Sequence, residues 1–229
     1  NSNIFIEKPG CISPHEIRNL ISFQKDTKLN FRVGYQRKYH PIFTLIKRYI
    51  NLKTFGEIKK IDINVSSYIP DWHPYENYTS LYACNKDLGG GVLTTECHEI
   101  NMIIDLFGLP LSSDLSLSTR SKDIKTVSDT VVGCIEYSNF QVYLDISFYR
   151  KPLKRELIFE FQKYKLFWDI DAQTLKINAK NENKNEIQFN LKNDELFILQ
   201  AINVLKFEKT LTYNDLRHLE IYTYLLHNR

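Results

Sequence analysis

Lys8 and His98 are the two side chains whose types and surroundings best suit proton transfer and charge stabilisation. Lys8 follows an apolar run at residues 4–6 and belongs to the triplet Glu7-Lys8-Pro9, which is typical of the carboxyl end of a buried parallel strand. In open α/β sheets that end is where ligands bind. A histidine suits proton exchange because its unperturbed pKa of about 6.5 lies near working pH.

Both residues also have ordinary structural explanations. Lys8 would then be a solvated lysine at a strand end, and His98 a histidine whose ring binds a backbone carbonyl. The glycines at residues 89–91 favour a functional interpretation of His98, because glycine lets the backbone approach a ligand closely.

A single helix is predicted after these glycines. Residues 93–107 carry apolar side chains at three- and four-residue steps, and Gly108 ends the pattern. His98 lies beside this apolar stripe, with Thr95 on the same face. Glu96 is one residue further along and is therefore expected to be rotated about 100° away on the helix.

The first segment predicts a β-α-β unit. Ser13 can cap a helix that begins at Pro14, Glu16 completes a capping box, and a strand follows at residues 31–35. We therefore interpret residues 1–36 as the last piece of a doubly wound sheet.

In much of the rest of the chain, apolar and polar residues alternate with a period of two. This pattern is clear at residues 61–65, 141–148 and 156–161. Ser138-Asn139 is expected to form a hairpin turn between strands at residues 131–137 and 140–148. The predicted fold class is α+β: an open, mainly antiparallel sheet with helices on one face, preceded by the β-α-β piece. Further helices are expected at residues 41–50 and after Thr212, and a solvated turn at residues 180–186.

Several motifs repeat those of one known family, in order along the chain. They are Glu7-Lys8-Pro9, Val33-Gly34-Tyr35-Gln36-Arg37, Tyr68-Ile69-Pro70-Asp71-Trp72 and Gly89-Gly90-Gly91-Val92-Leu93-Thr94-Thr95-Glu96-Cys97-His98. The chain resembles the C-terminal portion of the Gfo/Idh/MocA (glucose-fructose oxidoreductase / inositol dehydrogenase) family of two-domain NAD(P)-dependent sugar oxidoreductases. Within that family it is similar to the branch that acts on sugars for surface polysaccharides.

The resemblance implies a division at residue 36. Residues 1–36 would be the remnant of a truncated Rossmann domain, and residues 37–229 a substrate-binding and oligomerisation domain. The larger part of the nucleotide-binding domain, with its Gly-rich turn, is absent from the sequence, so the chain alone is expected to be inactive.

The resemblance also implies roles for individual residues. Lys8 and His98 would be catalytic, with Glu7, Thr95 and Glu96 as possible support. Many relatives carry a carboxylate where this chain has Thr95. The cofactor would be NAD or NADP.

The remaining expected site residues fall into two groups. The residues that would contact the cofactor are Glu7, Lys8 and Pro9. The residues that would bind a sugar or nucleotide sugar are Arg37, Tyr39, Tyr68, Asp71, Trp72, Tyr75 and Arg150. Aromatic side chains stack on sugar rings and polar ones bind hydroxyls, while arginine favours bidentate contacts with phosphate.

Composition excludes several classes of function. The net charge of +3 is too small to predict nucleic-acid binding, and no apolar run approaches the roughly 20 residues that span a bilayer. The four scattered cysteines have no metal-binding spacing and indicate reduced thiols in a cytoplasmic protein.

Two interpretations of the function remain open on the sequence. The first is the substrate-binding part of an oxidoreductase that transfers hydride at a sugar hydroxyl or ketone. The alternative is a non-catalytic sugar-binding or dimerisation module left by a split or decayed gene. In either case the sheet is expected to form a homodimer or homotetramer through its free face, with Tyr143 in the interface.

Overall fold

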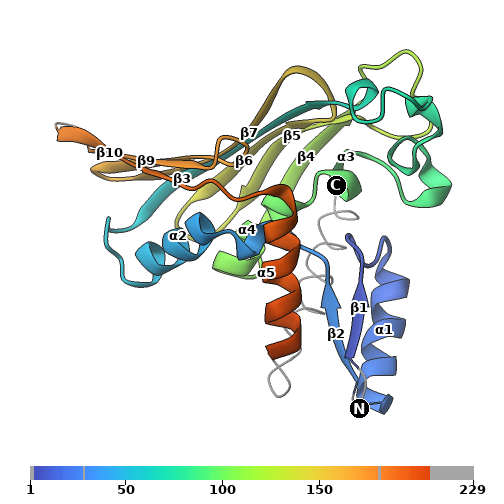
Figure 1. The fold of residues 1–229 in the computed structure, drawn as a ribbon, viewed down its shortest axis with the longest axis horizontal. Coiled ribbons are helices and arrows are strands. Elements are labelled where there is room, and N and C mark those ends of the chain that lie inside the picture. Colours follow the sequence, from blue (N-terminus) through green and yellow to red (C-terminus); the bar gives the residue numbers. More distant parts are fainter. Residues whose placement is uncertain (1–2, 28, 180–181, 207–229) are drawn as a thin grey trace.

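A small parallel β-α-β unit forms one part of the structure. The computed structural model describes residues 3–27, 29–179 and 182–206. Strand β1 (Asn3–Ile6) pairs in parallel with β2 (Asn30–Val33), and helix α1 (Pro14–Thr27) connects them (Figure 1).

The predicted capping box starts α1. The Ser13 hydroxyl accepts a hydrogen bond from the Glu16 amide at 3.2 Å. The Glu16 carboxylate accepts from the amides of Ser13 at 3.2 Å and Ile12 at 2.8 Å. These bonds satisfy donors near the helix start, and the predicted β-α-β piece is confirmed.

An eight-stranded sheet forms the larger part. Its strand order is β10-β9-β8-β7-β3-β6-β5-β4, and β3 pairs with β6 in parallel while the other neighbouring pairs are antiparallel. The strands are β3 (Ile58–Tyr68), β4 (Ser112–Ser118), β5 (Thr130–Glu136), β6 (Gln141–Ser147), β7 (Tyr149–Phe161), β8 (Tyr164–Asp169), β9 (Thr174–Ala179) and β10 (Glu182–Gln188). The prediction of an open, mainly antiparallel sheet is confirmed.

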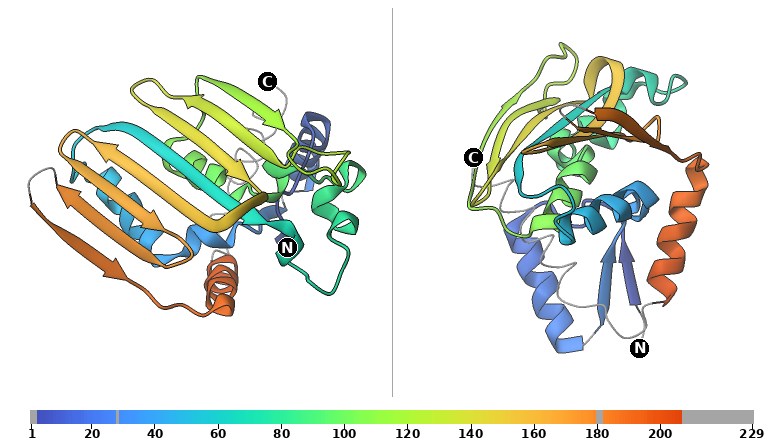
Figure 2. Two further views of the ribbon diagram at one scale, coloured as in Figure 1. Left: turned by 90° about the horizontal axis from the view of Figure 1, so that it is seen from above. Right: turned by 90° about the vertical axis from the view of Figure 1, so that its left-hand side faces the viewer.

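Helices cover one face of this sheet. Helices α2 (Pro41–Asn51) and α4 (His98–Phe107) lie against the inner face, and no described helix lies on the outer face (Figures 1 and 2). The inward residues Ile61, Ile63 and Val65 of β3 are fully buried, as their alternation predicts.

The remaining helices lie away from the sheet or in its connections. Helix α5 (Asn193–Lys206) flanks the β1–β2 pair on the side opposite α1 (Figures 1 and 2). Single turns of 3-10 helix occupy the connections: η1 (Gln36–Tyr39), η2 (Ile69–Asp71), η3 (Tyr78–Ser80), η4 (Tyr82–Cys84) and η5 (Lys86–Leu88).

Two local predictions are wrong. The helix expected over residues 93–107 is two helices, α3 (Val92–Thr95) and α4, because Glu96 has φ −101° and ψ 51°. The segment expected as a solvated turn contributes β10, which pairs with β9. The helix predicted after Thr212 lies outside the described residues.

Candidate active site

Lys8 lies just past the carboxyl end of β1, where its ammonium group is held between two oxygens. Its Nζ donates to the Thr95 carbonyl at 2.9 Å and to the Tyr82 hydroxyl at 3.2 Å. Burial by itself lowers the Lys8 pKa, but interactions with Cys97, Tyr82 and Glu96 outweigh it, and the pKa lies above its usual value. Lys8 is therefore a fixed cation at neutral pH.

The glycines bring Tyr82 to this lysine. The Gly91 amide donates to the Ala83 carbonyl and the Gly90 amide to the Asn85 carbonyl, each at 2.9 Å. A Cβ atom at Gly90 would lie 2.6 Å from the Ala83 oxygen and 2.7 Å from the Asn85 oxygen, and it would also collide with the Tyr82 carbonyl. At Gly90 the missing side chain makes room for the loop that carries Tyr82, whereas the sequence suggested room for a ligand.

His98 is the first residue of α4 and is buried. Its ring packs edge-on against Tyr35 at 6.1 Å between centroids, and the Tyr35 hydroxyl donates to the Pro9 carbonyl at 3.2 Å. Burial, followed by the charges of Arg37, Lys8 and Arg155, holds the His98 pKa well below its usual value. The imidazole is therefore neutral at neutral pH, which makes it a proton acceptor, and its Nδ1 has no hydrogen-bond partner.

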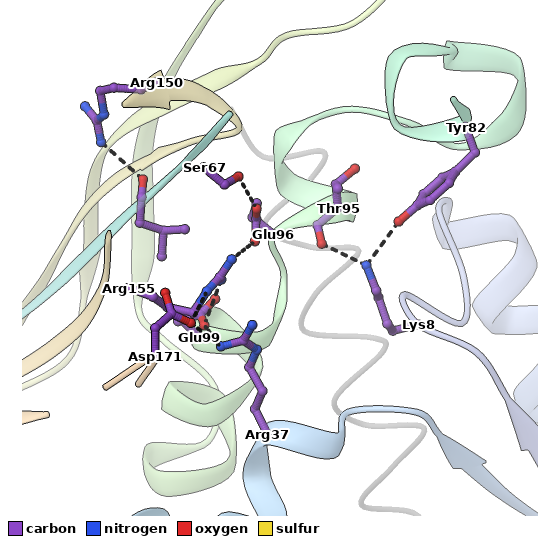
Figure 3. A network of polar contacts seen from close by, with 11 residues as sticks. Lys8, Arg37, Ser67, Tyr82, Thr95, Glu96, Glu99, Arg150, Arg155 and Asp171 are labelled. Atoms are coloured by element: carbon purple, nitrogen blue, oxygen red, sulfur yellow. Dashed lines mark hydrogen bonds and ion pairs between the residues drawn. The ribbon is translucent and has the colours of Figure 1, made fainter. Parts of the chain in front are cut away.

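A buried ion cluster is built around Arg155 (Figure 3), and Arg155 and Arg37 are near enough to His98 to lower its pKa. The Arg155 guanidinium donates to Glu96 Oε2 at 2.8 Å and to Glu99 Oε1 at 3.1 Å. Glu96 Oε1 accepts from the Ser67 hydroxyl at 2.8 Å. Burial raises the Glu96 pKa, but Arg155 and Ser67 outweigh that effect and hold it below the usual value.

Arg37 joins this cluster more loosely. Its guanidinium lies 3.8 Å from Glu99 Oε1 and 4.0 Å from Asp171 Oδ1, beyond ordinary hydrogen-bond length. Burial and the nearby Arg155 lower its pKa. With Gln36, Asp171 and other residues it lines a cavity of about 210 Å³, so donors of Arg37 remain near a space that a small ligand could enter.

The three residues expected to support catalysis are placed differently from one another. Glu7 accepts a hydrogen bond from the Lys8 amide at 3.3 Å, and its carboxylate lies against Gly34. Thr95 offers its backbone carbonyl to Lys8, while its hydroxyl is buried without a partner. Glu96 turns away from Lys8 into the ion cluster. The Lys8–Pro9 peptide bond is cis.

The expected sugar-binding residues contact several different partners in the structure. Asp71 pairs with Lys151 at 2.7 Å, and the Lys151 ammonium lies 4.5 Å from the centre of the Tyr68 ring. The Arg150 guanidinium binds both Asp145 carboxylate oxygens, at 2.8 and 3.0 Å, and lies apart from Lys8 (Figure 3).

Three more aromatic residues of the expected set also lie outside the Lys8 contacts. Trp72 packs against Phe148 with ring centroids 6.3 Å apart. Tyr75 is largely exposed and binds His73 at 3.0 Å, and Tyr39 lines a separate cavity near α2. Arg37, by contrast, reaches the ion cluster beside His98 through Glu99.

Sequence reasoning missed Tyr82 and Arg155. Tyr82 carries no sequence signal, because its contact with Lys8 joins residues far apart in the chain. Arg155 had a readable signal: it shares the inward parity of Leu157 and Phe159, and a charge at an inward position requires a buried partner.

Metal-binding groups and membrane-spanning helices are two further features to consider in the described residues. Within residues 3–27, 29–179 and 182–206, no group of three or more His, Cys, Asp or Glu side chains could hold a metal ion. No helix in those ranges is long and apolar enough to cross a membrane.

Solved NAD-binding oxidoreductases share this fold. An NAD-binding oxidoreductase from Klebsiella pneumoniae matches 98% of this chain and 70% of its own at 12% identity, with a TM-score of 0.83. A levoglucosan dehydrogenase in complex with NADH and levoglucosan gives the same coverage and TM-score at 16% identity. A UDP-N-acetylglucosamine 3-dehydrogenase from Acidithiobacillus ferrooxidans matches 99% of this chain and 69% of its own at 14% identity, with a TM-score of 0.72.

These neighbours are of the type that the sequence resemblance indicated, so the resemblance is confirmed at the level of the fold. No sequence-family profile matches the chain, and no curated protein does. The chain spans about 70% of the length of the first solved structures that it matches.

Proposed function

We propose that this chain is the substrate-binding and catalytic part of an NAD(P)-dependent oxidoreductase of the Gfo/Idh/MocA family. The substrate would be a sugar or nucleotide sugar, oxidised or reduced at a hydroxyl or ketone. The observation that carries the proposal is the Lys8 cation, held by two oxygens beside the neutral, buried His98.

In the proposed reaction, Lys8 would stabilise negative charge on the substrate oxygen and His98 would accept its proton. As a hydroxyl is oxidised its oxygen gains alkoxide character, which the Lys8 ammonium stabilises. Because His98 is neutral, it can accept the hydroxyl proton, directly or through a water molecule. The Tyr82 hydroxyl accepts from Lys8 and keeps its own proton free to donate to a substrate oxygen.

Only the nicotinamide end of a cofactor suits the residues present. Glu7, Lys8 and Pro9 lie at the carboxyl end of a parallel strand, the edge at which doubly wound sheets bind dinucleotides. The nicotinamide, when bound, accepts or supplies the hydride. The pyrophosphate would bind in a cofactor domain joined to this chain, and the greater length of the matched oxidoreductase structure supports this part of the proposal.

The two-part division and the substrate class belong to the same proposal. Residues 1–36 would belong to the cofactor domain and residues 37–229 to the substrate domain. Two solved neighbours are named for a sugar derivative and a nucleotide sugar, which supports a carbohydrate substrate for this chain. A role in surface-polysaccharide synthesis in the cytoplasm is part of the proposal.

One observation favours a second candidate, a dimerisation module. The outer sheet face exposes Val132 and Tyr143, and no described helix covers it. This role is compatible with catalysis, since the outer face is opposite the side that holds Glu96 and Arg155.

The test of the proposed function is a protein in which this chain is joined to its cofactor-binding half. Lys8→Ala and His98→Ala should each lower turnover of NAD⁺ with a sugar substrate by roughly 10²-fold, with cofactor affinity nearly unchanged. Turnover is measured as absorbance of the reduced nicotinamide across a panel of sugars and nucleotide sugars.

Thr95→Ala is the matched control. It keeps the backbone carbonyl that binds Lys8, so it should lower turnover much less than His98→Ala does. Equal losses in these two variants would place the Thr95 hydroxyl in the proton path and contradict the role given to His98.

A further inference from the structure

Lys8 depends on a carbonyl that an uninterrupted helix would not leave free. In a continuous α-helix the Thr95 carbonyl would accept from the amide four residues later, at Glu99. Here α3 ends at Thr95 and α4 begins at His98, and the Thr95 carbonyl accepts instead from Lys8 Nζ at 2.9 Å. The interruption of the helix therefore creates half of the Lys8 site.

The residue at the interruption is held out of the helix by two neighbouring strands. Glu96 is 3% exposed, and its carboxylate accepts from Ser67 of β3 and from Arg155 of β7, both at 2.8 Å. A charged carboxylate is retained in such a buried position only when it is paired and hydrogen-bonded.

Arg155 holds both sides of the interruption at once. One nitrogen of its guanidinium binds Glu96, between the helices, and another binds Glu99, in the first turn of α4. Glu99 is fully buried, and a carboxylate in the first turn of a helix is favoured by the helix dipole. Only arginine offers two donors in a rigid fork that can bridge two carboxylates in this way.

We infer that Arg155 is a positioning residue for Lys8: by binding Glu96 and Glu99 it keeps the helix interrupted and the Thr95 carbonyl directed at the lysine. Arg155 is 6% exposed and would not contact substrate itself. The inference rests on the proposed function for its catalytic meaning, but its test measures Lys8 directly and needs no activity.

The experiment replaces Arg155 in a background in which its two close carboxylate partners are already neutral amides. Removing Arg155 alone would leave the buried carboxylates of Glu96 and Glu99 without their main cationic partner and could unfold the protein. The reference is therefore Glu96→Gln/Glu99→Gln, whose amide oxygens can still accept from Arg155, and the test variant adds Arg155→Met. Both are made in the full 229-residue chain.

The readout is acetylation of Lys8 by acetic anhydride near pH 8, measured by mass spectrometry relative to the exposed Lys59. Adding Arg155→Met should make Lys8 at least about threefold more reactive, because an ammonium that loses an acceptor while staying partly buried deprotonates more readily. Loss of a nearby cation alone would make Lys8 less reactive, so the sign separates positioning from simple electrostatics.

A second measurement follows the helix itself. The ¹³Cα shift of residue 96 should move towards helical values when Arg155→Met is added, and Arg155→Lys in the same background should restore part of both effects. A folded test variant in which Lys8 reactivity and this shift equal those of the reference would overturn the inference. If the test variant does not fold, Arg155→Lys in the same background replaces it as the test variant. The inference is then overturned if Lys8 reactivity and the ¹³Cα shift of residue 96 both equal those of the reference.

Discussion

At the scale of single residues, burial lowers the pKa of both proposed catalytic groups, but their neighbours shift the two pKa values in opposite directions. Lys8 is desolvated but gains enough from the groups around it to remain charged. His98 is desolvated and faces the cations Arg37, Lys8 and Arg155, so it remains neutral. A charged lysine and a neutral histidine are the states needed to stabilise an alkoxide and accept its proton.

The neutral state of His98 should appear in the pH dependence of stability. Below about pH 6.5 the unfolded chain gains a proton at residue 98 that the folded chain does not, so the free energy of unfolding should fall as pH falls. This contribution is fully present above that pH. Its slope is at most about 1.4 kcal/mol per pH unit for one proton.

Urea unfolding of the chain between about pH 5 and 7 measures this slope, and His98→Gln should reduce it. His40 has a lowered pKa for the same main reason, burial, so part of the slope should remain in the variant. An unchanged slope in His98→Gln would mean that His98 titrates normally in the folded chain.

At the scale of elements, the site depends on two irregular features of the backbone. The interruption at Glu96 frees the Thr95 carbonyl for Lys8, and the glycines let the loop around Tyr82 pack against their backbone. Neither feature belongs to a regular helix or strand, and together they supply both oxygens that bind Lys8.

Gly90→Ala tests the second feature. The added methyl group would overlap three backbone carbonyls, at Tyr82, Ala83 and Asn85, and fixed backbone cannot move aside as a flexible side chain can. We expect the free energy of unfolding in urea to fall by about 1–3 kcal/mol, as for other overpacked sites.

Gly34→Ala is the control for this substitution. Its methyl group would meet the ends of the Glu7 and Phe5 side chains at 3.1–3.2 Å, which can adjust. A loss in Gly34→Ala as large as that in Gly90→Ala would show that the close approach of the Tyr82 loop is not the cause.

At the scale of the whole molecule, the sheet separates two surfaces of different character. Its inner face carries fully buried residues such as Ile63, Leu157 and Trp168. Its outer face carries charged pairs, such as Lys154 with Glu156, together with half-exposed apolar and aromatic side chains. Such a mixed, uncovered face is suited to assembly with a second copy.

Tyr143→Lys should weaken a homodimer or homotetramer formed through this face. The Tyr143 ring is 42% exposed and lies 4.9 Å from Lys60 Nζ, so the substitution removes an aromatic contact and places two ammonium groups together. We expect the dissociation constant to rise by about tenfold or more.

Analytical ultracentrifugation at tens of micromolar measures this assembly. Tyr75→Lys, which alters an exposed tyrosine in the loop before η3, should leave assembly unchanged. A clean monomer for the unaltered chain would rule out the outer face as an assembly surface at these concentrations.

The sequence by itself determined the regular parts of the fold. The capping box at Ser13, the alternation in β3, β6 and β7, and the hairpin at Ser138-Asn139 are local patterns whose physical causes act within a few residues. The motif around Lys8 also marked the end of a parallel strand correctly, since strand and turn are both local.

Only the tertiary structure decided what each polar side chain binds. Arg150 looked suited to a phosphate but binds Asp145, and Glu96 looked displaced on a helix but interrupts that helix to meet Arg155. Lys8 finds Thr95 across 87 positions of sequence. A buried charge must be paired, but its partner depends on how strands and helices pack. Local sequence patterns do not specify that packing.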